Sequence, residues 1–213
     1  CKKWLGDSFK DQSLAVTSNK SKADDLKFNK IILFEETIGG RFSIWSPISL
    51  PAIIELGESF LDFLRGAAKA DYALSEDNQD YINFLKHIVF SDIYFHNFLN
   101  INTRVVLPYS WKLRSFTNYV QQLEMESIGK AANQSSFFKK TGQIIFGGFG
   151  STAQHSYFQL LHQGTQKVCA DIITIKKNKN RNGLLYAQSI TQASLLSTLP
   201  KDSLEGFEKI NSN

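Results

Sequence analysis

Short apolar runs alternate with amphipathic stretches along this chain, and this alternation restricts the possible folds more than any other feature of the sequence. Apolar runs bounded by turn residues are typical of buried strands, and they occupy residues 13–19, 30–35, 104–108, 143–146 and 168–175. Apolar residues at helical spacing follow from residue 51 and over residues 82–89, 116–123 and 157–163. Because strands that alternate with helices form parallel sheets covered by those helices, we expect an α/β fold with doubly wound parallel sheets flanked by helices.

The stretch that begins at Pro51 predicts one amphipathic helix. Its apolar face would carry Ile53, Gly57, Phe60, Leu61, Leu64 and Ala68. Its polar face would carry Glu55, Glu58, Asp62 and Arg65. Proline is favoured in the first turn of a helix, so we expect a single helix that starts near Pro51, runs through residue 68 and covers a neighbouring surface.

The charge balance is mildly basic, since 24 Lys and Arg against 20 Asp and Glu give a net charge of +4 and a pI near 8.9. Such a balance suits an anionic ligand. The densest basic run, residues 176–181, could bind nucleic acid, but it follows a strand-like segment and lacks interleaved aromatic residues that would stack on bases. We therefore interpret it as a solvated loop and expect no nucleic-acid partner.

The cysteine content and the absence of long apolar stretches indicate the compartment. Cys1 and Cys169 are too few for a disulfide framework or a zinc site, which is typical of a reducing environment. No apolar stretch approaches the length of a membrane span, and the chain start lacks the apolar core of a signal peptide. We expect a cytoplasmic protein with no membrane partner, and, since the first residue is not Met, a fragment of a longer chain.

Glu126 is the first candidate for chemistry. On a helix it would lie at the flank of the apolar stripe of residues 116–123, and Gln122 would lie one turn before it. Partial burial disfavours a charged carboxylate, raises its pKa and makes it a better base near neutral pH. The alternative is a surface glutamate without a catalytic role, and spacing alone favours that alternative.

A glycine-rich stretch, residues 147–152, follows the run that ends at Phe146. Its glycines permit a sharp turn into a helix whose first turn attracts anions, but it lacks the third glycine of a dinucleotide fingerprint and the lysine of a phosphate loop. A plain strand-to-helix turn is at least as good an interpretation. His155 and His162 beyond it share a helical face and could bind a metal, but no acidic or Cys ligand accompanies them, so we expect no metal.

Arg41 follows two glycines within residues 36–43 and would stand at the end of a strand. Its guanidinium is a fixed cation with several donors, which suits an enediolate or phosphate oxygen. A structural ion pair with a carboxylate is an equally good interpretation.

Taken together, these stretches resemble the glucose-6-phosphate isomerase family, and they occur in the family's order. The resemblance rests on residues 38–46 (IGGRFSIWS), 107–109 (LPY), 119–130 (YVQQLEMESIGK) and 154–165 (QHSYFQLLHQGT). It extends over nearly all of the chain, and a spaced series of long motifs is more specific than any single motif. The sequence departs from the family pattern at Ser49, Ile128 and residues 147–153.

The resemblance implies a piece of an aldose–ketose isomerase that interconverts glucose 6-phosphate and fructose 6-phosphate in glycolysis and gluconeogenesis, without a cofactor. Residues 1–50 would end a first sugar-isomerase domain, residues 51–100 would be connecting helices, and residues 101–213 would belong to a second such domain. The family's Ser/Thr-rich phosphate cradle and its Lys-bearing terminal helix would lie outside this piece, so we expect the piece alone to isomerise poorly.

The resemblance also implies a homodimer with shared active sites and a sugar-phosphate substrate. Glu126 matches the family's base, Gln122 a substrate-binding residue, and Arg41 the cation near the reacting carbons. His155 matches the ring-opening histidine, which the neighbouring subunit would contribute. The alternative is a non-catalytic sugar-phosphate-binding regulator, against which the retained Arg41, Glu126 and His155 argue.

Overall fold

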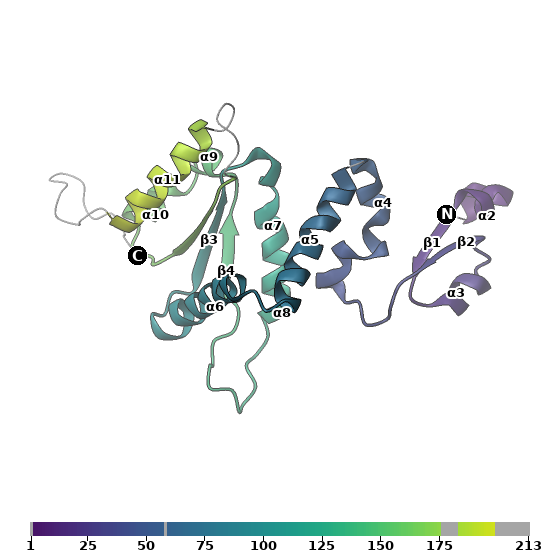
Figure 1. Cartoon of the computed structure of the whole chain (residues 1–213), viewed down its shortest axis with the longest axis horizontal. Coiled ribbons are helices and arrows are strands. Elements are labelled where there is room, and N and C mark those ends of the chain that lie inside the picture. Colours follow the sequence, from purple (N-terminus) through teal and green to yellow (C-terminus); the bar gives the residue numbers. More distant parts are fainter. Residues whose placement is uncertain (1, 58, 176–182, 199–213) are drawn as a thin grey trace. The chain divides into compact units, whose positions relative to one another are not determined.

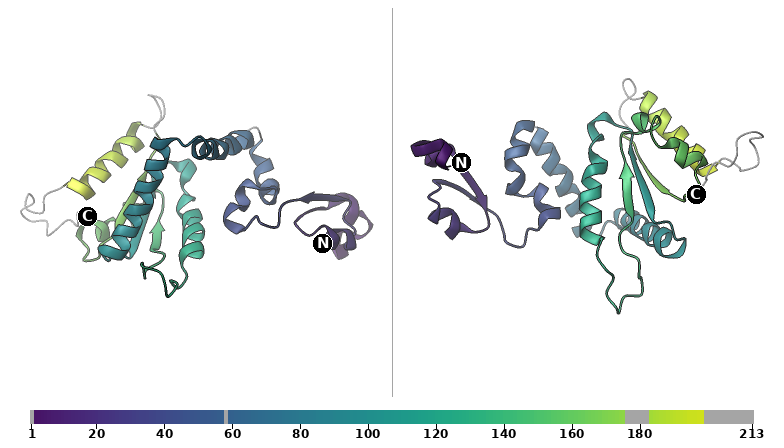
Figure 2. Two further views of the ribbon diagram at one scale, coloured as in Figure 1. Left: turned by 60° about the horizontal axis from the view of Figure 1, so that its bottom comes forward. Right: turned by 180° about the vertical axis from the view of Figure 1, so that it is seen from behind.

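The computed structural model describes residues 2–57, 59–175 and 183–198. Contacts divide the chain into two compact units, Cys1–Leu85 and Lys86–Asn213, and each is described by itself. Figures 1 and 2 show their elements, coloured along the chain from purple to yellow. The three segments expected from the sequence refer to the domains of a longer protein, and that division stays a prediction.

The first unit begins with a pair of parallel strands. Its first elements are α1 (Lys2–Leu5), η1 (Gly6–Ser8), α2 (Phe9–Gln12), β1 (Leu14–Thr17), α3 (Lys20–Asp25) and β2 (Lys30–Leu33). In the strand pair, Leu14 lies opposite Lys30 and Thr17 lies opposite Leu33. A parallel pair needs a crossover, and α3 provides it. Both strands fall within the runs that predicted them, so these two predictions are confirmed.

The helix expected from Pro51 is broken in the structure. The elements after β2 are η2 (Gly40–Trp45), η3 (Pro47–Ser49), α4 (Leu50–Ile53), η4 (Ile54–Leu56) and α5 (Ser59–Ser75). Gly57 has φ 56° and ψ −133°, a conformation that glycine adopts at little cost and that ends a helix. The prediction of one helix through residue 68 is therefore wrong, because the glycine assigned to its apolar face is the point where the first helical piece stops.

The second unit is built on a three-stranded parallel sheet. The helix α6 (Gln79–Ile93) leads into it through a π-helical turn, η5 (Tyr94–Phe98), and the strands are β3 (Thr103–Pro108), β4 (Ile144–Gly147) and β5 (Cys169–Ile173). Their order is β4-β3-β5, and Val105 of β3 lies opposite Phe146 and Ala170. Each strand lies within or overlaps its predicted run, so these predictions are confirmed.

Helices cover both faces of this sheet (Figure 2). They are α7 (Phe116–Val120) on one face and α9 (Gly150–Ala153), α10 (Phe158–Gln163) and α11 (Gly183–Thr198) on the other. Val105 and Leu107 pack in one apolar cluster, and Val106 packs in a second, because successive side chains of a strand point to opposite faces. The central strand is thus buried on both sides, and the expected fold class is confirmed.

Cys169 lies at the start of β5, with its thiol buried in the sheet. Its Sγ accepts a hydrogen bond from Gln143 Nε2 at 3.4 Å and donates one to the carbonyl oxygen of Thr103 at 3.4 Å. Burial raises the pKa of this thiol, and the Gln143 contact opposes that shift. The sulfur therefore ties β5 to β3 as a protonated thiol.

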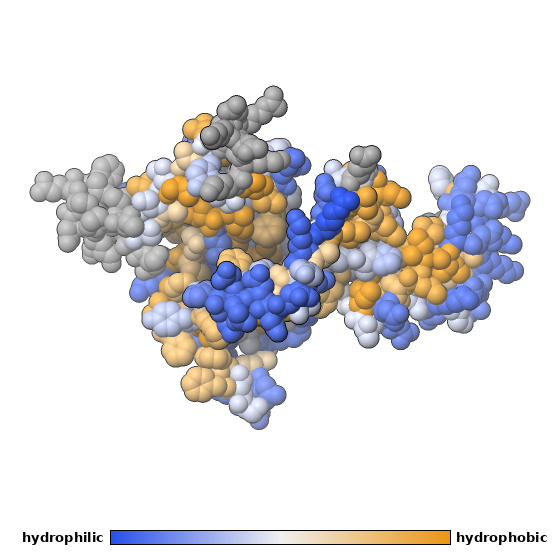
Figure 3. Space-filling view, viewed as in Figure 1, coloured by the Kyte–Doolittle hydropathy of each residue, from blue (hydrophilic) through white to orange (hydrophobic). Residues whose placement is uncertain are grey.

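Apolar side chains also reach the surface of the second unit. Figure 3 shows apolar surface around α11, where Leu184 is 73% exposed and Ile190 is 51% exposed. Apolar patches of this kind mark contact surfaces when they are extensive. No helix in the described part of the chain is long and apolar enough to cross a membrane.

Candidate active site

One helical segment after β3 carries two of the candidate residues. It consists of α7, the π-helical turn η7 (Gln121–Met125) and α8 (Glu126–Ile128). On its sheet-facing side, Thr117 Oγ1 donates to the carbonyl oxygen of Val106 at 3.0 Å. One turn later, Gln121 Nε2 donates to the carbonyl oxygen of Ile145 at 2.8 Å. These two hydrogen bonds fix the rotation of α7 and of the first residue of η7 on the sheet.

Gln122 and Glu126 are both exposed in this chain. The sequence pattern predicted a partly buried Glu126, and that expectation is wrong for the chain as described. A π-turn holds about one residue more than an α-turn, so it rotates the residues after it by about 100° relative to the stripe on α7. The apolar stripe therefore does not extend to Glu126.

Glu126 lies at the amino-terminal end of the parallel strands. The backbone N–H of Gly142, which stands just before β4, donates to the carbonyl oxygen of Ile128 at 3.0 Å. Lys130 Nζ donates to the carbonyl oxygens of Glu126 at 2.9 Å and Ser127 at 2.8 Å. These hydrogen bonds pair carbonyl groups that have no partner within the helix at its end. The end of α8 is thus anchored beside the first residues of β4.

The glycine-rich stretch forms a strand-to-helix turn at the opposite, carboxyl-terminal end of β4. A Cβ on Gly147 would lie 2.1 Å from the carbonyl oxygen of Val106, and one on Gly150 would lie 2.4 Å from the Tyr109 ring. Both glycines are therefore required by the close approach of neighbouring groups. The helix that follows, α9, has only four residues, so the plain-turn interpretation describes this stretch better than an anion site does.

The hydroxyl groups of two tyrosines, Tyr109 and Tyr157, are buried close to this turn. Burial raises the pKa of Tyr109, and the amide of Gln154 opposes the shift. Burial, together with the nearby Tyr109, raises the pKa of Tyr157 to about 12. Both side chains therefore stay neutral.

His155 lies in the exposed turn between α9 and α10, where its backbone N–H donates to the carbonyl oxygen of Thr152 at 3.1 Å. It follows the carboxyl end of β4, whereas Glu126 lies beside the amino end. The four residues of β4 span about 13 Å at the usual rise per residue. Figure 1 shows α8 and α9 at opposite ends of the strands. One chain therefore does not bring Glu126 and His155 to the same reacting atoms.

His162 is engaged within the fold. Its Nε2 lies 2.8 Å from Nε2 of Gln192, which connects α10 to α11, and burial lowers the pKa of the imidazole. Among the described residues, no group of three His, Cys, Asp or Glu side chains could hold a metal ion. The pair of His155 and His162 thus has no further ligand in that part of the chain.

Arg41 belongs to the first unit. It lies in η2, directly after two glycines, and its side chain is exposed. Within the described ranges it forms no ion pair with a carboxylate, so the structural alternative considered from the sequence has no contact to support it. The second unit therefore holds Gln122 and Glu126 on one segment and His155 at the other end of the strands, whereas Arg41 belongs to the first unit.

A buried ion cluster on the sheet was missed by the sequence interpretation. Arg104 is 4% exposed and pairs with Asp92, Glu124 and Asp171. Burial alone would lower the pKa of Arg104, but the hydrogen bond and charge of Asp92, with those of Glu124, raise it above its usual value. Partial burial raises the pKa of Asp171, whose side chain is 49% exposed, and the charge of Arg104 opposes that shift. The sequence feature that could have indicated this cluster is Arg104 itself, a charged residue in an otherwise apolar strand.

The ion cluster borders an open cavity of about 740 Å³ beside the candidate segment. Apolar side chains from α6, from α8 and from the loop before β4 form much of its wall: Ile88, Val89, Ile93, Ile128 and Phe138. Asp92, Arg104 and Glu124 also line it. On the side that faces this cavity, the segment is thus held by the ion pair of Glu124 with Arg104, and apolar side chains surround that ion pair.

Replacing Gly147 by alanine is expected to destabilise the second unit. The residue has φ 145°, and the added Cβ would overlap the carbonyl oxygen of Val106, so the strands must shift at a cost of about 2–3 kcal/mol. Thermal unfolding of the full-length protein measures this loss as a lower Tm. Gly66→Ala is the control, because that position in α5 is open and helical, and its Tm should stay the same or rise. An unchanged Tm for Gly147→Ala would contradict the prediction.

A model of the phosphoglucose isomerase family matches residues 1–199 of the chain. The chain is 38% identical over 193 residues to a glucose-6-phosphate isomerase of Stutzerimonas stutzeri and 41% identical over 169 residues to one of Legionella pneumophila. These alignments cover 86% and 78% of this chain and 34% of each relative. The chain thus spans about a third of the length of these curated relatives.

The fold of the chain is also similar to that of a solved structure. The crystal structure of a glucose-6-phosphate isomerase from Chlamydia trachomatis superposes with a TM-score of 0.77 at 30% identity, over 99% of this chain and 44% of that one. The sequence match therefore agrees with the arrangement of strands and helices described above. On these grounds, the chain belongs to the phosphoglucose isomerase family.

Proposed function

We propose that the protein to which this chain belongs is a glucose-6-phosphate isomerase, which interconverts glucose 6-phosphate and fructose 6-phosphate. The observation that carries the proposal is the docked segment α7–η7–α8, which is hydrogen-bonded to the sheet on one side and presents Gln122 and Glu126 on the other. A base on a rigid, anchored element is what proton transfer at carbon requires. The names of the relatives support the same reaction.

In the proposed mechanism, His155 assists opening of the sugar ring. Glu126 then removes the proton from the second carbon and returns it to the first, and Gln122 contacts the substrate beside it. Arg41 stabilises the negative oxygen of the cis-enediolate that forms between the two transfers. One proton moves from the second carbon to the first and one from the second oxygen to the first, so substrate and product are isomers and we propose that the reaction needs no cofactor.

We further propose that the protein is a homodimer in which each active site takes His155 from the partner chain. The separation of Glu126 and His155 along β4 supports this, because a hexose phosphate is shorter than the path between them. A cytoplasmic location and a place in glycolysis and gluconeogenesis belong to the same proposal, since they follow from the reaction and from the resemblance.

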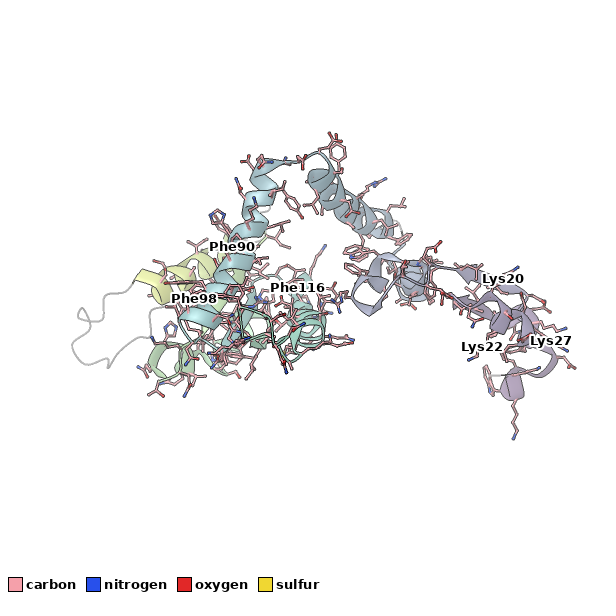
Figure 4. The ribbon with its side chains drawn as sticks, turned by 90° about the horizontal axis from the view of Figure 1, so that it is seen from below. Lys20, Lys22, Lys27, Phe90, Phe98 and Phe116 are labelled. Carbon is pink, nitrogen blue, oxygen red and sulfur yellow. The ribbon has the colours of Figure 1, made fainter. Side chains whose placement is uncertain are left out.

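A nucleic-acid-binding role has weaker support. Figure 4 labels the exposed lysines Lys20, Lys22 and Lys27 in and just after α3, but Asp24 and Asp25 stand in the same stretch and offset their charge. The basic run of residues 176–181 lies outside the described residues. The charge of the described part therefore favours a small anion over a polyanion.

The direct test is turnover of fructose 6-phosphate by the full-length protein, measured as glucose 6-phosphate formed. Turnover supports the enzyme, and tight binding of the sugar phosphate without turnover would identify the regulator instead. A parallel titration with an oligonucleotide at low and high salt covers the third outcome, because only binding to nucleic acid loses affinity steeply with salt.

A further inference from the structure

One buried arginine joins the sheet of the second unit to the segment that carries the candidate base. The side chain of Arg104 is 5% exposed and forms ion pairs with Asp92 at 2.5 Å, Glu124 at 2.5 Å and Asp171 at 3.4 Å. We propose that Arg104 is a positioning residue, which acts through Glu124 to hold Glu126 in the orientation needed for proton transfer. This inference rests on the proposed isomerase function.

Glu124 is the carboxylate that reaches the candidate base. Asp92 comes from α6 and Asp171 from β5, whereas Glu124 stands in η7, two residues before Glu126. Helical positions two apart do not face the same way, so Glu124 can point to the sheet while Glu126 points outward. The ion pair therefore fixes the rotation of the segment immediately before Glu126.

The ion pair of Glu124 with Arg104 matters because Glu124 lies within the π-helical turn η7. A π-helical turn is rare and less favourable than an α-turn, so tertiary contacts must hold it in place. The hydrogen bonds of Thr117 and Gln121 anchor the segment before and at the first residue of the turn, and the Glu124 carboxylate anchors its fourth residue. If the last anchor is lost, the turn can relax to α-helix and rotate Glu126 by about 100°.

We expect the buried environment to strengthen the ion pair of Arg104 with Glu124, but we do not expect the fold to depend on this ion pair. The guanidinium is almost fully buried, so its ion pairs are screened less than those on the surface. When Glu124 is replaced by glutamine, Arg104 keeps Asp92 and Asp171 as partners and is not left as an unpaired buried charge. The sheet should therefore survive the change, and the effect should fall on the orientation of the segment.

The experiment compares Glu124→Gln with Asp92→Asn in the full-length enzyme. Both changes remove one negative charge that lies 2.5 Å from Arg104, and the two side chains are 32% and 33% exposed. They differ in that only Glu124 belongs to the segment of the base. We expect Glu124→Gln to lower kcat about tenfold to a hundredfold with little change in KM, since a misplaced catalytic group lowers turnover rather than binding. Asp92→Asn should change kcat less than about threefold.

Two further readouts separate positioning from general damage. Exchange of the hydrogen on the second carbon with solvent should fall in parallel with kcat for Glu124→Gln, and Glu124→Asp, which keeps the charge, should recover part of both. Thermal unfolding of the same variants shows whether stability differs. Equal losses of kcat in Glu124→Gln and Asp92→Asn, or a loss that follows Tm alone, would overturn the positioning role. An inactive wild-type enzyme would overturn the proposed function as well, whereas an active wild type with equal variants overturns only this inference.

Discussion

Glu126→Gln in the full-length protein is expected to reduce isomerisation about a hundredfold to ten-thousandfold while leaving ring opening intact, which is the range for loss of a general base. The amide keeps the size of the carboxylate and its reach from the anchored α8, but it cannot accept the proton from the second carbon. The loss should therefore appear in kcat, with KM nearly unchanged. The measurement is exchange of the second-carbon hydrogen with deuterated water, run beside interconversion of the sugar's anomers.

The control is Glu76→Gln, which makes the same change of charge at an exposed position after α5 and should leave turnover unaltered. Hydrogen exchange that persists in Glu126→Gln would assign the base to another group. Loss of anomer interconversion together with exchange would remove the division of labour between Glu126 and His155.

Mixing two inactive variants is expected to restore activity. Chains with Glu126→Gln and chains with His155→Ala should each be nearly inactive, because every active site of either homodimer lacks one group. In a mixed dimer, one of the two sites combines an intact Glu126 with an intact His155. Random pairing makes about half of the dimers mixed, so about a quarter of wild-type activity should return. Turnover is measured after the chains have been allowed to exchange.

A matched control excludes recovery from exchange alone. Mixing the His155→Ala chain with a chain that carries both substitutions gives no intact site and should stay inactive. Mixed dimers, identified by two different affinity tags, that still show no turnover would place both groups in the same chain's site. That result would contradict the interpretation drawn from their separation along β4.

The strands of this chain could be predicted from the sequence because their apolar runs are local signals. The central strand β3 is buried on both faces, and such strands appear as continuous apolar runs. The break at Gly57 was missed because a glycine at a helical position looks the same in a periodicity whether it continues the helix or ends it. The difference lies in its positive φ, which the spacing of apolar residues does not encode.

The candidate site was predicted in part. The sequence placed Gln122 and Glu126 on one helical segment, and the structure does so too. The exposure of Glu126 was not predictable, because it depends on a π-turn that long-range contacts hold in place. Arg104 pairs with side chains from α6, η7 and β5, which are far apart in the sequence, so no local sequence pattern indicates this ion cluster.

The buried thiol of Cys169 makes the integrity of the sheet chemically measurable. A thiol reagent reacts with the thiolate, and here the sulfur is enclosed between Gln143 and the backbone of Thr103, with its pKa raised by burial. Labelling at neutral pH must therefore wait until β5 moves away from β3, so the labelling rate reports how often that edge of the sheet opens. A substitution that loosens the strands, at Gly147 or elsewhere, would accelerate labelling even while the folded population still predominates.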